Sequence, residues 1–188
     1  MGKLKVRISL PRNEQSYGKK MMFDEAVRFY AKEIMGSRLA NLCKIKVHFR
    51  KYVSRRKGAN VGGYVAMNPT GSKRQRSFKI TLNAHHDTVT QMRILAHEMI
   101  HVKQKAKDEA QWRYNMKTDT LWVRWKDNAP VKHDEIPYRE RPWEVEAYAL
   151  QDKYYASYIQ MVSKQKAVQE RLRKYISVAL VKVTDILK

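Results

Sequence analysis

The stretch that decides the fold is Ile94-Leu95-Ala96-His97-Glu98-Met99-Ile100-His101, in which two histidines stand four residues apart within an apolar pattern. The apolar residues recur at helical spacing, which predicts an amphipathic helix from Thr88, as N-cap, to about Lys105. Residues i and i+4 share one helix face, so both imidazoles can reach one metal ion. Two neutral imidazoles suit zinc, and the glutamate beside them can act as a general base.

A catalytic zinc site needs a third protein ligand, and a second predicted helix offers two glutamates. Glu144 and Glu146 follow Pro142, which suits the first turn of a helix from Trp143 to about Val162. The two glutamates lie about 200° apart on a helix, so only one can face the metal, and periodicity does not separate them. Other candidate ligands are histidines that we expect instead on surface loops: His133 with Asp134, and His85 and His86.

Strands are predicted where apolar and polar residues alternate, at residues 4–10, 45–49, 64–67 and 78–82. The last two are joined by the turn sequence Asn68-Pro69-Thr70-Gly71 and a basic tip. Residues 22–42 show helical spacing. The sequence therefore predicts an α+β fold, in which a small mixed or antiparallel sheet packs on the two metal-site helices.

The length of 188 residues corresponds to one domain over residues 1–188. Residues 107–142 have weak periodicity and three tryptophans, so we interpret them as a long, partly ordered insertion. Residues 163–188 predict a basic C-terminal helical extension. The single Cys43 excludes an intramolecular disulfide framework and a cysteine-cluster zinc ribbon.

Taken with Glu144-Val145-Glu146-Ala147 far downstream, the His97–His101 motif resembles the gluzincin branch of the zincin metallopeptidases. In that branch a second helix supplies a glutamate, often within Glu-x-x-Ala followed by Asp or Asn. The resemblance therefore favours Glu144, although Tyr148 stands at the position that follows. The layout over roughly residues 60–160 is also similar to SprT-like and phage-encoded metallopeptidases.

This resemblance implies a zincin-like minimal fold and a role for each motif residue. His97, His101 and Glu144 would bind Zn²⁺, and Glu98 would activate water for attack on a peptide carbonyl. A tyrosine often assists the oxyanion, for which the candidates are Tyr114, Tyr138 and Tyr148. Gln104, one turn beyond His101, is a candidate to support that imidazole, but we favour a solvated helix face for it.

The net charge is +21, from 39 Lys and Arg against 18 Asp and Glu, and it favours nucleic acid or another polyanion as a partner. Basic residues cluster in three places. The aromatic residues of the insertion could stack on unpaired bases, but our first interpretation is that they pack the insertion onto the domain. The clusters are Arg50, Lys51, Arg55, Arg56 and Lys57; Lys73, Arg74 and Arg76; and Lys164, Lys166, Arg171, Arg173 and Lys174; the aromatics are Trp112, Tyr114, Trp122 and Trp125.

The chain has no apolar run long enough to span a bilayer, and its N-terminus lacks the apolar stretch of a signal peptide. We therefore expect a cytoplasmic protein, within a host cell or virion if phage-encoded. The expected function is zinc-dependent hydrolysis of peptide bonds, of the endopeptidase type, near nucleic acid or in a nucleoprotein or virion assembly. The alternative is a nucleic-acid-binding or virion structural protein on a metallopeptidase scaffold. Substrate specificity and oligomeric state stay open.

Overall fold

The computed structural model describes residues 3–12, 16–51, 62–67 and 76–186, with side chains as far as residue 170. The chain divides into two units, Met1–Tyr155 and Ala156–Lys188. The first unit contains two small sheets and the helices that position the candidate site, and the second is formed by the remainder of the last helix.

A four-stranded sheet forms the centre of the first unit, with strand order β1-β2-β4-β3. The strands are β1 (Lys5–Ser9), β2 (Lys44–Arg50), β3 (Gly63–Met67) and β4 (Ser77–Asn83). β1, β2 and β4 are parallel neighbours, whereas β3 pairs with β4 in the antiparallel sense. The prediction of an α+β fold with a mixed sheet is confirmed.

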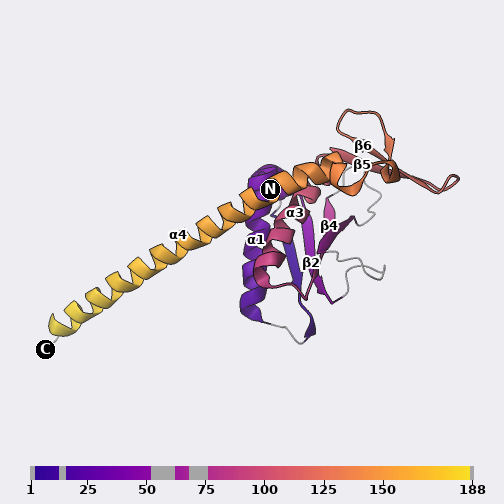
Figure 1. Cartoon of the computed structure of the whole chain (residues 1–188). Coiled ribbons are helices and arrows are strands. Elements are labelled where there is room, and N and C mark those ends of the chain that lie inside the picture. The colour runs from indigo at the N-terminus through magenta and orange to yellow at the C-terminus, as the bar shows by residue number, and fades with distance from the viewer. Residues whose placement is uncertain (1–2, 13–15, 52–61, 68–75, 187–188) are drawn as a thin grey trace. The chain divides into compact units, whose positions relative to one another are not determined.

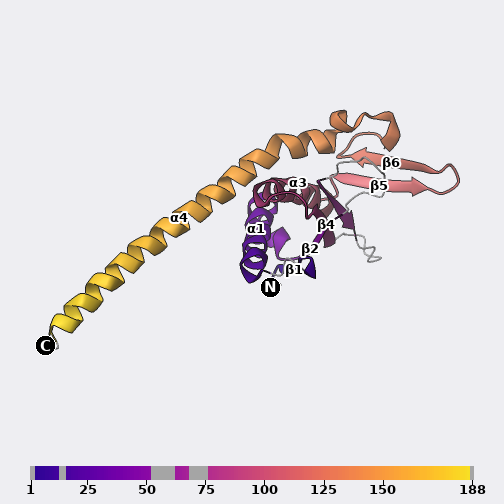
Figure 2. The ribbon, with the colours of Figure 1, turned by 60° about the horizontal axis from the view of Figure 1, so that its bottom comes forward.

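Two long helices, α1 (Tyr17–Met35) and α3 (Thr88–Ala106), pack together on one face of this sheet (Figure 1, Figure 2). Alternate residues of β2 are buried beneath them, and Phe49 meets Phe23 of α1 edge to face at 4.7 Å. The predicted helix over residues 22–42 is wrong in its bounds. Ser16 caps α1, and Gly36 with φ 78° separates it from α2 (Ser37–Ala40), because glycine adopts this backbone conformation without steric cost.

The N-cap of α3 is Asp87 rather than the predicted Thr88. The Asp87 side chain accepts a hydrogen bond from the Thr90 backbone N–H at 3.0 Å and another from the Thr90 hydroxyl at 2.6 Å. A carboxylate at this position also complements the helix dipole. From Leu95 to Val102 every residue of α3 is buried, so the histidine motif lies inside the protein.

The predicted insertion is a three-stranded antiparallel sheet followed by two short 3₁₀ helices. The strands are β5 (Ala110–Asn115), β6 (Thr120–Trp125) and β7 (Val131–Lys132), and the 3₁₀ helices are η2 (His133–Glu135) and η3 (Tyr138–Glu140). The apolar face of this sheet presents Trp112 and Trp125 to Trp143, at ring distances of 6.2 and 6.4 Å. Pairing between the strands, rather than strong periodicity within each, orders the segment.

The last helix, α4, runs from Pro142 to Ile186 and begins at the proline that the sequence indicated. Among the residues that the structure describes, no helix has both the length and the apolar composition that crossing a bilayer requires. Several predicted features lie outside the described residues: the 68–71 turn, Arg55, Arg56, Lys57, Lys73 and Arg74, and the side chains of Arg171, Arg173 and Lys174. Arg76 is not part of a free basic tip, because it donates to the Ala106 carbonyl oxygen at 2.6 Å.

Candidate metal centre

Three buried side chains from α3 and α4 point their donor atoms at one another. His97 Nε2 and His101 Nε2 are 3.1 Å apart, and Glu144 Oε2 lies 3.4 and 3.5 Å from them. All three residues are at most 9% exposed. Of the described residues, this is the group of histidine, cysteine and acidic side chains whose donor atoms can share a metal ion.

These distances fit a tetrahedral zinc site. Ligand atoms about 2.0–2.1 Å from a tetrahedral zinc ion are separated from one another by about 3.3 Å. The three measured separations lie close to that value. Glu144 Oε2 is also buried without a hydrogen-bond partner within the described part of the chain, which is costly for a carboxylate that does not bind a cation.

A glutamine supports each imidazole from behind. His101 Nδ1 lies 2.7 Å from Gln104 Oε1, and His97 Nδ1 lies 3.2 Å from Gln151 Oε1. An amide oxygen can only accept, so Nδ1 carries the proton in both rings and Nε2 keeps its lone pair. Two lone pairs that face each other at 3.1 Å repel unless a proton or a metal ion lies between them, so this arrangement favours a metal site.

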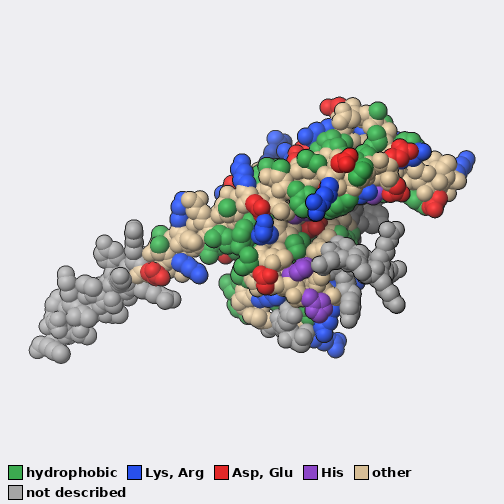
Figure 3. Space-filling model, viewed as in Figure 1, with side chains coloured by type: hydrophobic (Ala, Val, Ile, Leu, Met, Phe, Trp, Pro, Cys, Tyr) green, Lys and Arg blue, Asp and Glu red, His purple; other side chains and the backbone are tan. Residues whose placement is uncertain are grey.

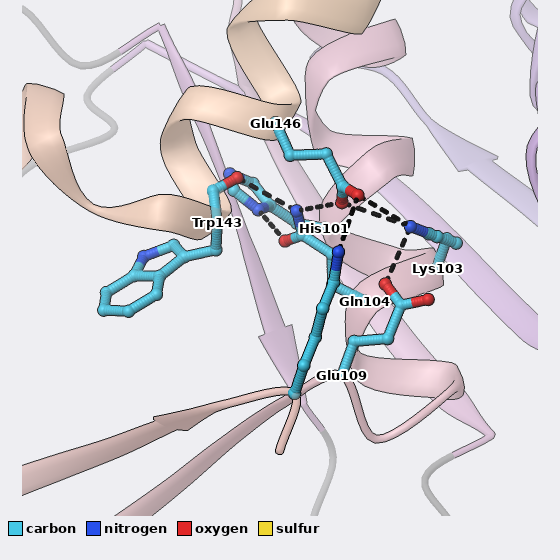
Figure 4. Close-up of polar contacts among 7 residues, drawn as sticks. His101, Lys103, Gln104, Glu109, Trp143 and Glu146 are labelled. Carbon is cyan, nitrogen blue, oxygen red and sulfur yellow. Dashed lines mark hydrogen bonds and ion pairs between the residues drawn. The ribbon is translucent and has the colours of Figure 1, made fainter. Parts of the chain in front are cut away.

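Gln104 is itself held by the first turn of α4 (Figure 4). Its Nε2 donates to the Trp143 carbonyl oxygen and to Glu146 Oε2, both at 2.9 Å. The expectation of a solvated face for Gln104 is wrong, because the residue is fully buried. Glu146 does not join His97, His101 and Glu144, which we call the metal group. It lies instead 3.1 Å from the Lys103 ammonium, which also contacts Glu109 at 2.7 Å.

Glu98 is buried beside the metal group. It is 4% exposed, and its Oε2 has no hydrogen-bond partner in the described part of the chain. Burial raises the pKa of Glu98 to about 7, with a further increase from Glu144 and opposing effects of His97 and Lys105. A carboxyl group with this pKa can exchange a proton near neutral pH.

The pKa of Glu144 is shifted in the opposite direction to that of Glu98. Burial favours its neutral form, but the contacts with His101, His97 and Tyr138 outweigh burial and hold the pKa of Glu144 below its ordinary range. The pKa of the neighbouring Tyr138 is shifted upward. Burial and the negative charge of Glu144 raise the pKa of the Tyr138 hydroxyl, which therefore keeps its proton.

A pocket of about 680 Å³ opens over the metal group, within the range of natural ligand sites. One wall is the start of β3, where Gly62 and Gly63 pass close to α3. A Cβ at position 63 would come within 2.8 Å of Ile94 and 3.2 Å of Glu98 Oε1. A larger residue at position 63 would force Ile94 or the strand to shift, so glycine allows the strand to lie against this side of the helix.

Lys105 contributes a cation to the pocket wall, and sequence reasoning did not identify it. Its ammonium lies 3.6 Å from the centroid of the Trp112 ring. Burial lowers the pKa of Lys105 to about 8, opposed by the nearby charges of Glu98 and Glu144. Its position one turn beyond His101 is the signal in the sequence that could have indicated it.

The remaining candidates divide between the pocket and the surface. His133, Tyr138 and Tyr148 line the pocket, with Tyr148 4.7 Å from the His97 ring, but His133 stays outside the metal group and lies 2.9 Å from Asp134. His85 and His86 occupy the turn before α3. Tyr114 is exposed and bonded to Asp119.

Comparisons with protein-family models, with curated proteins and with solved structures found no match to this chain. The resemblance to zincin metallopeptidases therefore rests on the sequence motifs alone.

Proposed function

We propose that the chain is a zinc-dependent metallopeptidase. The observation that carries this proposal is the convergence of His97 Nε2, His101 Nε2 and Glu144 Oε2 at tetrahedral spacing. When bound, zinc supplies Lewis acidity that polarises a carbonyl oxygen and lowers the pKa of water towards 7. The buried, unpartnered carboxylate of Glu98 beside the group supplies the base that peptide hydrolysis needs.

The proton path runs through Glu98. Its Oε2 accepts the proton of the attacking water, and the same oxygen then returns that proton to the amine that leaves. The pKa of about 7 suits both steps, because neither the acid nor the base form is strongly disfavoured near neutral pH. Gln104 and Gln151 keep the two imidazoles oriented throughout.

Other groups in the pocket can bind the substrate and the oxyanion. Within the described residues β3 pairs with β4 alone, so its other edge carries backbone groups that can pair with an extended peptide. The Tyr138 hydroxyl, whose raised pKa keeps it protonated, is a hydrogen-bond donor for the oxyanion beside Glu144.

The test compares the wild type with Glu98→Gln after zinc loading, and uses Glu25→Gln on the exposed surface of α1 as the matched control. Cleavage of casein and of a basic protein is measured with and without DNA, and zinc per chain by elemental analysis. We expect Glu98→Gln to keep its zinc and lose at least a hundredfold in rate, roughly the contribution of a general base. Unchanged activity in Glu98→Gln, or a zinc-loaded wild type that cleaves neither protein, contradicts the proposal.

A second candidate is a nucleic-acid-binding or virion structural protein in which the metal serves the fold alone. The net charge of +21 favours it. A purely structural zinc site has no need of Glu98, so equal behaviour of wild type and Glu98→Gln would favour this candidate.

A further inference from the structure

One face of the four-stranded sheet collects positive charge. The residues of β2 that alternate with Ile45, Val47 and Phe49 point away from α1 and α3, and the residues paired with them in β1 and β4 point the same way. Two rows of cations result, Lys5 beside Lys44 and Arg7 beside Lys46 and Lys79. We call this the basic sheet face: Lys5, Arg7, Lys44, Lys46, Arg50 and Lys79.

This face has no acidic counterpart. The sequences of β1, β2, β3 and β4 contain neither aspartate nor glutamate. In the described part of the chain, none of the six cations forms an ion pair with a carboxylate. In the view of Figure 3, red and blue side chains are interspersed over much of the described surface.

The pKa of His48 reflects the positive charge of this face. Its side chain projects from β2 on the same side as Lys46 and Arg50. Partial burial lowers the pKa of His48, and the positive charges of Lys79, Arg50, Lys46 and Arg7 lower it further. Four cations therefore act on one imidazole, and no carboxylate offsets them.

Adjacent strands are about 4.8 Å apart, so neighbouring cations in a row repel one another. A polyanion removes that repulsion and gains entropy from the counterions that it releases. Among the described residues, Tyr64 in the next row is the aromatic side chain near the array. Single-stranded nucleic acids bind mainly through rows of aromatic stacking partners, and the described residues of this face form no such row.

We propose that the basic sheet face binds the phosphate backbone of a nucleic-acid duplex without reading its sequence. This proposal does not rest on the peptidase proposal, because the metal group lies on α3 and α4, and α3 covers the opposite face of the sheet. Binding is measured without any protein substrate, so either proposal can fail while the other stands.

The test measures fluorescence anisotropy of a labelled 20-base-pair DNA duplex with the zinc-loaded full chain between 50 and 300 mM NaCl. The variant Arg7→Gln with Lys46→Gln removes two charges from the face. Its matched control, Lys32→Gln with Arg38→Gln, removes two exposed charges from α1 and α2. We expect the slope of log affinity against log salt to fall by about 1.8 in the first variant, since each phosphate contact contributes about 0.9.

The charge-preserving variant Arg7→Lys with Lys46→Arg should keep the wild-type slope, and duplex binding should raise the pKa of His48 in a proton NMR titration. Four results overturn the proposal. They are a wild type that does not bind the duplex at 50 mM NaCl, equal loss of slope in both charge-removing variants, tighter binding of a 20-nucleotide single strand, and equal competition by polyglutamate.

Discussion

Charged side chains are arranged differently in the candidate metal centre and on the basic sheet face. In the metal centre Glu144 contacts two imidazoles, and Glu146 contacts Lys103 and Gln104. On the basic sheet face, like charges stand side by side, and five of the six residues are exposed, with Lys79 half-buried. Charges that are partnered within the chain fix an internal geometry, whereas unpartnered charges of one sign are available to an external ligand.

The largest expected effect comes from removing a partnered charge at the metal centre. Glu144→Gln should lower zinc affinity by more than about a hundredfold, because it removes a charged donor, whereas supporting residues are worth about 10–100-fold. A competition titration with a chromophoric chelator measures this. Glu146→Gln is the control, and equal losses in the two variants would show that the assignment of Glu144 is wrong.

The metal-free protein should show the cost of burying the Glu98 carboxyl group, whose Oε2 has no hydrogen-bond partner in the described part of the chain. The folded pKa of Glu98 is about 7 against an ordinary 4.5, so the folded protein holds a proton that the unfolded chain loses between these pH values. Stability should therefore fall as pH rises from 4.5 to 7, by at most about 3 kcal/mol. Lys105 acts in the opposite sense above pH 8, because its lowered pKa makes stability rise with pH there.

Urea unfolding of chelator-treated protein at pH 5.5, 6.5 and 7.5 tests this effect. The titratable groups facing Glu98 are His97, Glu144 and Lys105, and they are the same in the variant Glu98→Gln. That variant should lose the fall with pH, and Glu25→Gln should keep it. A fall of the same size in Glu98→Gln would assign the effect to another group.

An intermediate effect is expected for the support behind His101. Gln104→Leu removes the acceptor at Nδ1 and leaves Glu146 without that donor, so zinc affinity should fall by about 10–100-fold. The chelator titration measures it, with Gln111→Leu on β5 as the control. A zinc affinity equal to that of the wild type would mean that Gln104 does not orient the imidazole.

The smallest effect belongs to the basic sheet face. Lys46→Gln relieves repulsion from Arg7 and Lys79 and should raise the melting temperature by about 1 °C at 10 mM salt. The gain should disappear at 1 M salt, where charges are screened over about 3 Å. A melting temperature that falls at low salt would mean that Lys46 has a partner within the chain.

The sequence predicted the elements whose periodicity is strong, and the reason for each failure is visible in particular residues. The four strands of the main sheet and α3 carry clear alternation or helical spacing. The β5–β7 sheet was missed because its order comes from strand pairing and from Trp112 and Trp125 packing on Trp143. The break at Gly36 depends on one positive φ angle inside an otherwise helical pattern.

At the site, the spacing of side chains along α4 was an available signal. Glu144, Tyr148 and Gln151 stand at i, i+4 and i+7, so they share the face that meets His97. Glu146 lies off that face, beside Lys103. Extending the face along α4 would have separated the two glutamates, whereas the Gly62-Gly63 approach needs the tertiary structure.

The central claim is that His97, His101 and Glu144 together hold one divalent cation. X-ray absorption at the zinc edge on the zinc-loaded chain tests it most directly. The account predicts one zinc ion per chain with four nitrogen or oxygen neighbours at about 2.0–2.1 Å and scattering from two imidazoles, which the variant Glu144→Gln disturbs. A chain that retains no zinc after loading, or a spectrum without imidazole scattering, would contradict it.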